Sequence, residues 1–134
     1  AEQTILKLVK NNVNPSKAKI AILGLTFKEN CPDLRNTKVF DIIDNLKKYN
    51  CILMVSDEYA DKKEVIYELN TKLVNLDEIK KMDAIIIAVE HKRYKKLKVD
   101  DFKKILKPNG CLIDVKSIYG IDYFLKTSFV HWRL

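Results

Sequence analysis

The loop at residues 24–37 gathers residue types that suit binding of a phosphorylated ligand. It follows a short apolar run and leads into an amphipathic helix. Gly24 permits a tight turn, Phe27 can stack on a ring, and Lys28 and Arg35 are cations seven residues apart. Lys binds phosphate as a point charge and Arg can bind it through two hydrogen bonds. The free N–H groups of the helix N-terminus also attract anions. The loop therefore predicts an anion site.

Each of these side chains has an alternative structural role. The acids Glu29 and Asp33 could neutralise the two cations locally, and spacing alone leaves ligand contact and local pairing equally open. Phe27 could fill the core, which is the usual place for an aromatic ring. A third cation, Lys116, is expected at the same edge of the molecule. Three cations converging on one edge favour a polyanionic ligand.

The same loop holds a candidate nucleophile. Cys31 would need a positioned base and a lowered pKa, and His91 is a possible base across a neighbouring loop. We favour the alternative, an inert thiol in a binding loop. Neither His91 nor His131 has metal-ligand spacing with a cysteine, so no metal site is predicted.

Alternating strand and helix patterns predict the elements that position this loop. Short apolar runs predict strands at residues 18–23, 51–55, 72–74, 83–89 and 111–115. Helical spacing predicts helices at residues 2–11, 37–49, 59–69, 76–82 and 99–106, and residues 107–110 should then turn the chain. The tail at residues 119–134 has no clear period, and its aromatic residues should pack on the body. The first, fourth and fifth strands are apolar enough to be buried on both faces. The fold class is therefore α/β: a three-layer α/β/α sandwich with a parallel, Rossmann-like sheet of about five strands.

Ligands of open α/β sheets bind beyond the carboxyl ends of the strands. The loops at that edge are residues 24–36, 56–61, 90–96 and 114–120. A dinucleotide fold would carry G-x-G-x-x-G in the first of them, but Phe27 and Glu29 replace the glycines, so a standard dinucleotide site is excluded. Asp57 ends the second strand, where an acid can hold a ribose. Without the glycines, we expect it to be a surface acid or a helix cap.

The composition predicts a single globular domain. The 134 residues are 47% apolar and 32% charged, and no apolar run approaches the ~20 residues of a membrane span. Three cysteines without paired spacing fit a reducing, cytoplasmic setting. The net charge of +7 comes from scattered Lys, which favours a solvated surface over nucleic-acid binding. The N-terminus lacks both a signal peptide and an initiator Met, so we expect a piece of a longer chain.

The string GLTFKENCPDLR at residues 24–35 resembles the C-terminal, UDP-binding domain of the UDP-glucose/GDP-mannose dehydrogenase family. The resemblance continues through DAIIIAVEH at residues 83–91 and IDVK at residues 113–116, and it ends at Trp-Arg-Leu. It covers nearly the whole chain. The form with Asn30-Cys31-Pro32 is most similar to the UDP-N-acetylhexosamine 6-dehydrogenase branch.

This resemblance implies a function. Family enzymes oxidise C6 of a UDP-sugar to the carboxylate with two NAD⁺ and an active-site Cys, and they form dimers through a central helix. Phe27, Lys28 and Lys116 would contact the UDP-sugar, and Arg35 would reach the cofactor side. The UDP-sugar and the rest of the parent enzyme would be the partners, in surface or capsular polysaccharide biosynthesis, with no role for nucleic acid or membrane.

The resemblance also implies a division of the chain and a limit. Residues 1–14 would be the end of the central helix and a linker, and residues 15–134 the UDP-sugar-binding domain. The family's catalytic Cys and the NAD-binding glycine motif lie upstream and have no counterpart in this chain, so Cys31 is not the nucleophile. NAD would be bound mainly by a separate N-terminal domain, and this chain alone should be inactive. The alternative is a non-enzymatic α/β module that binds a nucleotide or a protein partner through the same edge.

Overall fold

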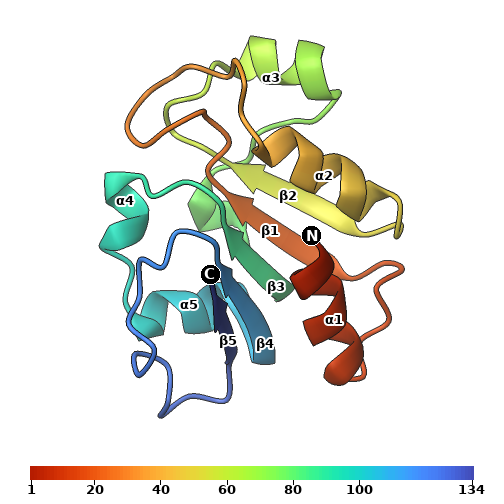
Figure 1. The fold of residues 1–134 in the computed structure, drawn as a ribbon, viewed down its shortest axis with the longest axis vertical. Helices are drawn as coiled ribbons and strands as arrows, with labels where there is room; N and C mark the ends of the chain where they lie inside the picture. The colour runs from red at the N-terminus through yellow and green to blue at the C-terminus, as the bar shows by residue number, and fades with distance from the viewer.

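The computed structural model describes all residues from 1 to 134 (Figure 1). The strands are β1 (Lys19–Leu23), β2 (Ile52–Ser56), β3 (Met82–Ile87), β4 (Leu106–Asp114) and β5 (Val130–Arg133). The helices are α1 (Glu2–Lys10), α2 (Val39–Lys47), α3 (Lys62–Leu69), the 3₁₀ turn η1 (Leu76–Glu78), α4 (Lys92–Lys95) and α5 (Val99–Ile105). Strands and helices alternate along most of the chain, as the sequence pattern predicts.

The five strands form one parallel sheet in the order β2-β1-β3-β4-β5. The chain leaves β1 toward one edge to form β2 and then crosses to the other side for β3, β4 and β5. The strand order therefore switches between β1 and β3, and the crevice for a ligand is expected beyond their carboxyl ends. The predicted α/β class with a Rossmann-like sheet of five strands is confirmed.

Both faces of the sheet are covered, because alternate residues of each central strand enter different cores. Ile20 and Ile22 of β1 pack in one cluster with α1, α2 and α3. Ala21 and Leu23 of the same strand pack in a second cluster, which contains Tyr94, Phe102 and Phe124 among others. These two layers fix the strands, and the strand ends then fix the loops that follow them. Leu6 and Val9 of α1 stay about half exposed, at 46% and 55%.

The fifth strand differs from the sequence prediction. Residues 72–74 make only an isolated bridge between Val55 and Leu73, so the strand expected there is wrong. The edge strand is instead β5, in the tail for which no period was evident, and it pairs with residues 111–114. The turn expected at residues 107–110 is wrong as well, because these residues lie within β4, where a bulge shifts the register of β4 against β3.

Helix bounds also differ in detail. The helix expected at residues 76–82 shortens to η1, because Met82 already begins β3. Helix α2 begins at Val39 with Lys38 as its N-cap, two residues later than predicted. Thr37 still serves the helix start, since its hydroxyl accepts a hydrogen bond from the Val39 N–H at 3.3 Å. No helix has the length and apolar character needed to cross a membrane.

Candidate ligand-binding site

A cleft of about 350 Å³ opens at the switch point of the sheet. Its walls come from the loop after β1, the first residues of α2, and the segments after β3 and β4. The lining residues are Thr26, Phe27, Asn36, Thr37, Lys38, Val39, Ala88, Val89 and Lys116. Parallel α/β sheets place ligands at this position. The cleft is therefore the candidate site.

Two of the residues nominated from the sequence line this cleft together. Phe27 is 54% exposed and belongs to neither core cluster, so it is free to contact a ligand. Lys116, which follows β4, lines the same cleft. A cation that the sequence reasoning missed, Lys38, lies beside the N-terminus of α2 in the same cleft. An aromatic ring, two ammonium groups and a helix N-terminus suit an anionic ligand that carries a flat ring.

The other two nominated cations lie apart from the cleft lining. Lys28 is exposed on the loop and makes no ion pair, so the local neutralisation by Glu29 does not occur. Arg35 pairs with Asp33 through two hydrogen bonds, at 3.0 Å from Nε and 3.1 Å from an Nη. These hydrogen bonds lower the pKa of Asp33. Arg35 lines a neighbouring cleft with Glu64 and others, so the expected convergence of three cations is only partly present.

The start of the loop is fixed by Gly24. Its φ is +92°, and a Cβ built on it would lie 2.5 Å from the Cβ of Val89. Glycine is required there because the loop passes directly against the end of β3. Further along, Phe27 and Glu29 present side chains to solvent where a dinucleotide-binding loop has glycines. The loop therefore does not fit the pyrophosphate cradle of a dinucleotide such as NAD.

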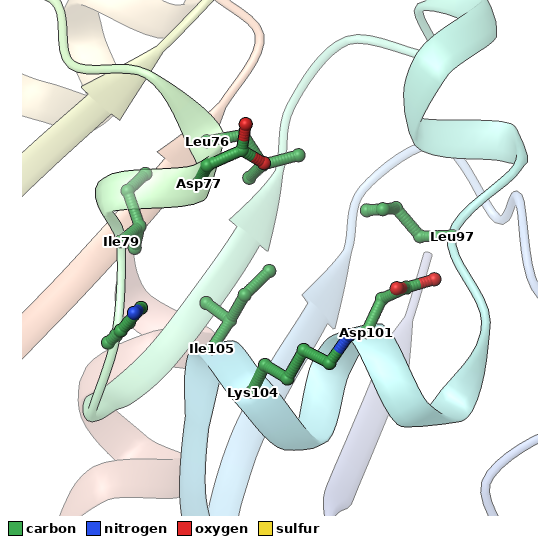
Figure 2. Close-up of a pocket in the computed structure, with 8 residues that line it drawn as sticks. Leu76, Asp77, Ile79, Leu97, Asp101, Lys104 and Ile105 are labelled. Carbon is green, nitrogen blue, oxygen red and sulfur yellow. The ribbon is translucent and has the colours of Figure 1, made fainter.

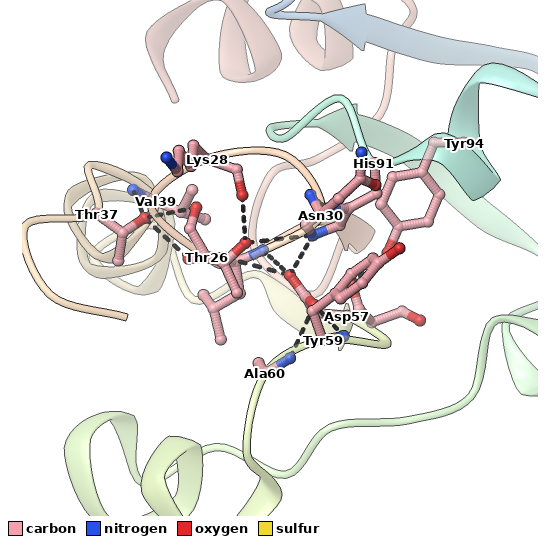
Figure 3. Close-up of polar contacts among 12 residues, drawn as sticks. Thr26, Lys28, Asn30, Thr37, Val39, Asp57, Tyr59, Ala60, His91 and Tyr94 are labelled. Carbon is pink, nitrogen blue, oxygen red and sulfur yellow. Dashed lines mark hydrogen bonds and ion pairs between the residues drawn. The ribbon is translucent and has the colours of Figure 1, made fainter. Parts of the chain in front are cut away.

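A buried carboxylate, Asp57, organises the base of the loop (Figure 3). Its side chain is fully buried, so the expectation of a surface acid is wrong. Five donors converge on its two oxygens: Leu25 N at 2.6 Å, Thr26 N at 3.2 Å, Tyr59 N at 2.8 Å, Ala60 N at 3.0 Å and His91 Nε2 at 2.8 Å. Asp57 thus ties the loop after β1 to the loop after β2 and to the segment after β3.

The pKa of Asp57 reflects two opposing effects. Burial alone would raise it, but the hydrogen bonds from His91, Leu25 and Tyr59 favour the ionised carboxylate more strongly. The net pKa lies below the ordinary value of 3.8. Asp57 is therefore an anion at neutral pH and an acceptor for all five donors.

His91 is also buried, and both of its ring nitrogens are committed (Figure 3). Nδ1 accepts a hydrogen bond from the backbone N–H of Asn30 at 2.9 Å, and Nε2 donates to Asp57 at 2.8 Å. These two bonds require the neutral imidazole with its proton on Nε2. With no free nitrogen, His91 is not placed to act as a base for Cys31. The inert-thiol interpretation of Cys31, which is half-buried, agrees with this arrangement.

The sequence indicated only part of the hydrogen-bond network around Asp57 and His91. Asp57 directly follows β2, and His91 lies in the segment that follows β3, so both are at the carboxyl edge, which is a position shared by many functional residues. The partners that make them structural were not predictable, because they are backbone N–H groups of two separate loops, after β1 and after β2. Tyr94 supports the network, since its hydroxyl donates to the Ser56 carbonyl at 2.8 Å and its ring lies 5.6 Å from that of His91.

A further depression contains none of the residues nominated from the sequence. The cleft in Figure 2, of about 290 Å³, lies between η1 and α5. Leu76, Ile79, Leu97 and Ile105 form its apolar part, and acidic and basic side chains from both elements surround it. None of its lining residues belongs to the loop after β1. The switch-point cleft therefore remains the best-supported site.

Comparison with known proteins identifies the family. Residues 21–121 match the model of the UDP-binding domain of the UDP-glucose/GDP-mannose dehydrogenase family. The chain belongs to this family, and the resemblance inferred from the GLTFKENCPDLR string is confirmed. The part that matches is the UDP-binding domain of a dehydrogenase, so the parent family consists of oxidoreductases.

Several of the similar proteins are named as dehydrogenases of UDP-N-acetylhexosamines. The chain is 41% identical to "Protein CapL" of Staphylococcus aureus, over 100% of this chain and 31% of that protein. It is 37% identical to UDP-N-acetyl-D-glucosamine 6-dehydrogenase of Salmonella typhi, over 88% of this chain and 28% of that protein. The structure of NDP-N-acetyl-D-galactosaminuronic acid dehydrogenase from Methanosarcina mazei Go1 superposes with a TM-score of 0.88 at 28% identity, over 98% of this chain and 27% of that one. The chain therefore spans less than a third of the length of these relatives.

Proposed function

We propose that this chain is the UDP-sugar-binding domain of an NAD-dependent nucleotide-sugar 6-dehydrogenase. The observation that carries the proposal is the switch-point cleft, which Phe27, Lys116 and the N-terminus of α2 line together. The family match gives the class of ligand, and the cleft supplies groups that suit it. Within the full-length protein, the substrate would be a UDP-hexose or, as the names of the similar proteins favour, a UDP-N-acetylhexosamine. The product would be the uronate, used in surface or capsular polysaccharide biosynthesis.

The residues of this chain would bind and orient the substrate. Phe27 would lie against the uracil or the sugar, and Lys28 and Lys116 would neutralise the diphosphate. Arg35 would face the cofactor side. Its pairing with Asp33 uses Nε and one Nη, so its remaining donors stay free, and the side chain is 85% exposed. NAD itself would be held mainly by a separate domain, because the loop after β1 lacks the glycines of a dinucleotide site.

The chain alone is expected to be inactive, since the family's catalytic Cys has no counterpart in it. Residues 1–14, which include α1, would connect to a central helix, and the full-length protein would be a cytoplasmic homodimer. The alternative is a non-enzymatic α/β module that binds a nucleotide or a protein through the same edge. A G-x-G-x-x-G motif and a Gly-rich Cys motif encoded upstream of Ala1 would favour the enzyme.

The test is steady-state kinetics of NAD⁺ reduction by the full-length protein with a panel of UDP-sugars. We expect Lys116→Ala to raise KM for the preferred UDP-sugar about tenfold or more, since one charge-assisted hydrogen bond contributes about 1.5–3 kcal/mol. Lys126→Ala is the matched control, because Lys126 is exposed and lies outside the cleft. A full-length protein that oxidises no UDP-sugar contradicts the proposal. Equal kinetics for the two variants would remove Lys116 from the site.

A further inference from the structure

The segment that carries Lys28 is held to the body of the domain at very few points. The Phe27 N–H donates to the Asp33 carbonyl at 2.7 Å and closes the segment into a loop. Between these two residues, the Lys28 carbonyl accepts a hydrogen bond from the neighbouring Thr26 hydroxyl at 3.0 Å. Only Asn30 forms hydrogen bonds with another part of the chain. Its N–H donates to His91 Nδ1 at 2.9 Å, and its Oδ1 accepts from the Lys92 N–H at 3.0 Å.

Asn30 suits this position for a backbone reason as well. Its φ is +54°, in the left-handed region that Asn tolerates better than most residues. That conformation turns the peptide N–H of Asn30 toward His91 while its side chain reaches Lys92. The apex of the loop is thus fixed from two directions by one residue.

The base of the same loop is fixed by the other nitrogen of the same imidazole. His91 Nε2 donates to Asp57, whose carboxylate also accepts from Leu25 and Thr26. One buried ring therefore joins the base of the loop to its apex (Figure 3). In the sequence, Phe27 and Lys28 lie between these two anchored points. The ring is itself held between Tyr59, at 4.8 Å between centroids, and Tyr94.

We propose that His91, in its neutral form with the proton on Nε2, is a positioning residue that pre-organises the loop for the UDP-sugar. The inference rests on the proposed function, because it assigns the loop a role in binding that ligand. His91 does not touch the substrate in this arrangement. It acts through Asn30, by restricting the loop before the ligand arrives, and pre-organisation of this kind favours binding.

Two substitutions of His91 separate its hydrogen bond with Asn30 from its hydrogen bond with Asp57. In His91→Asn, the amide oxygen can take the place of Nδ1 and still accept from the Asn30 N–H. In His91→Gln, the amide nitrogen can take the place of Nε2 and still donate to Asp57, but nothing is left to accept from Asn30. Both variants lose the ring between the two tyrosines, so each controls for the other's loss of packing.

We expect His91→Gln to raise KM for UDP-N-acetylglucosamine about tenfold in the full-length protein, with kcat within about twofold of wild type. His91→Asn should stay within about threefold of the wild-type KM. A purely structural role would affect both variants alike. Equal KM values for both variants and the wild type, or equal losses in both variants, would overturn the proposal.

A second variant avoids the buried ring altogether. Asn30→Gly keeps the left-handed backbone but removes the bond to Lys92 and loosens the apex, and it should raise KM about threefold or more. The matched control is Asn70→Gly, since Asn70 is an exposed asparagine with φ +48° at the end of α3. An unchanged KM in Asn30→Gly would overturn the role of the apex contact.

A ligand-free measurement distinguishes failure of this proposal from failure of the proposed function. Nitrogen-15 NMR of the imidazole should show His91 protonated at Nε2 and unprotonated at Nδ1 at neutral pH. A proton on Nδ1 would overturn the proposal while leaving the enzyme's activity untouched. A wild-type protein with the expected tautomer that neither binds nor oxidises any UDP-sugar would instead refute the proposed function, and with it the role of His91 in binding.

Discussion

Replacement of Asp57 by Asn should destabilise the domain strongly, although the two side chains have nearly the same size. The carboxylate accepts from three donors on one oxygen and from two on the other. An amide has only one acceptor oxygen, so its NH₂ group must face donors in either orientation. The better orientation keeps the three contacts to Leu25, Thr26 and His91 and abandons those to Tyr59 and Ala60.

The magnitude follows from this count. Each buried donor left without an acceptor costs about 1–3 kcal/mol, so two of them cost about 2–6 kcal/mol. A domain of this size has a total stability of about 5–15 kcal/mol, so the loss is a large fraction of it. We expect the free energy of unfolding to fall by about 3 kcal/mol or more at pH 7.

Urea denaturation followed by circular dichroism measures this change. The matched control is Asp61→Asn, because Asp61 is the exposed N-cap of α3 and accepts only the Glu64 N–H. Asn caps helices as well as Asp does, so the control should change stability by less than about 0.5 kcal/mol. If Asp57→Asn costs less than about 1 kcal/mol, the carboxylate does not organise the three loops as argued.

The same pair of proteins gives a pH test with a defined sign. Because the pKa of Asp57 is lower in the folded chain than its ordinary value of 3.8, its ionised form stabilises the fold above that value. This contribution is lost as the pH falls through the folded pKa. The stability difference between wild type and Asp57→Asn should therefore be constant from about pH 5 to 8 and shrink below about pH 4. A difference that shrinks already near pH 6 would mean that another group carries it.

Two further predictions concern the start of the loop and its exposed ring. Gly24→Ala should destabilise the domain by about 2–5 kcal/mol, seen as a lower Tm, because it adds left-handed strain to a Cβ contact of 2.5 Å with Val89; an unchanged Tm would contradict this close approach. Phe27→Ala should leave stability within about 0.5 kcal/mol, because the ring is 54% exposed and outside both core clusters. It should nevertheless raise KM for the UDP-sugar, and a loss of stability with unchanged KM would return Phe27 to a structural role.

The central strands of the fold could be predicted because each is indicated by a run of neighbouring apolar residues in the sequence. The strands β1, β3 and β4 contain unbroken apolar runs, and such runs are typical of parallel strands buried on both faces. Their carboxyl ends then determined which loops lie together. The same reasoning placed the loops that carry Phe27 and Lys116 at one edge of the sheet, and both residues line the cleft.

The edges of the sheet could not be predicted in this way. The segment at residues 72–74 and β5 are both short, and each could pair with an edge. The pairing of β5 depends on the chain between β4 and β5, whose Tyr119 and Phe124 pack against Phe102 and so bring β5 alongside β4. That packing joins residues far apart in sequence, so no local pattern reports it.

The roles of Asp57 and His91 were hidden for a related reason. A lone acid after a strand and a lone histidine after another are compatible with catalysis, ligand binding or structure. The number of backbone N–H groups that reach Asp57 and His91 decides between these roles. Those N–H groups belong to loops whose conformation cannot be predicted from the pattern of side chains. Only the left-handed Asn30 gives a local hint, since asparagine is favoured where φ is positive.

The loop after β1 must keep side chains exposed and still hold one conformation, and this explains why polar contacts anchor it. Phe27 and Lys28 must be exposed if they are to contact a ligand, so they cannot anchor the loop by burying themselves in a core. The anchoring falls to atoms that point inward, namely the backbone N–H groups of Leu25, Thr26 and Asn30. These groups need buried acceptors, and an ionised carboxylate and a neutral imidazole provide them in an otherwise apolar interior. Since a domain that forms only one side of a binding cleft offers few contacts to the ligand, order in the loop before binding matters more to it than to a closed site.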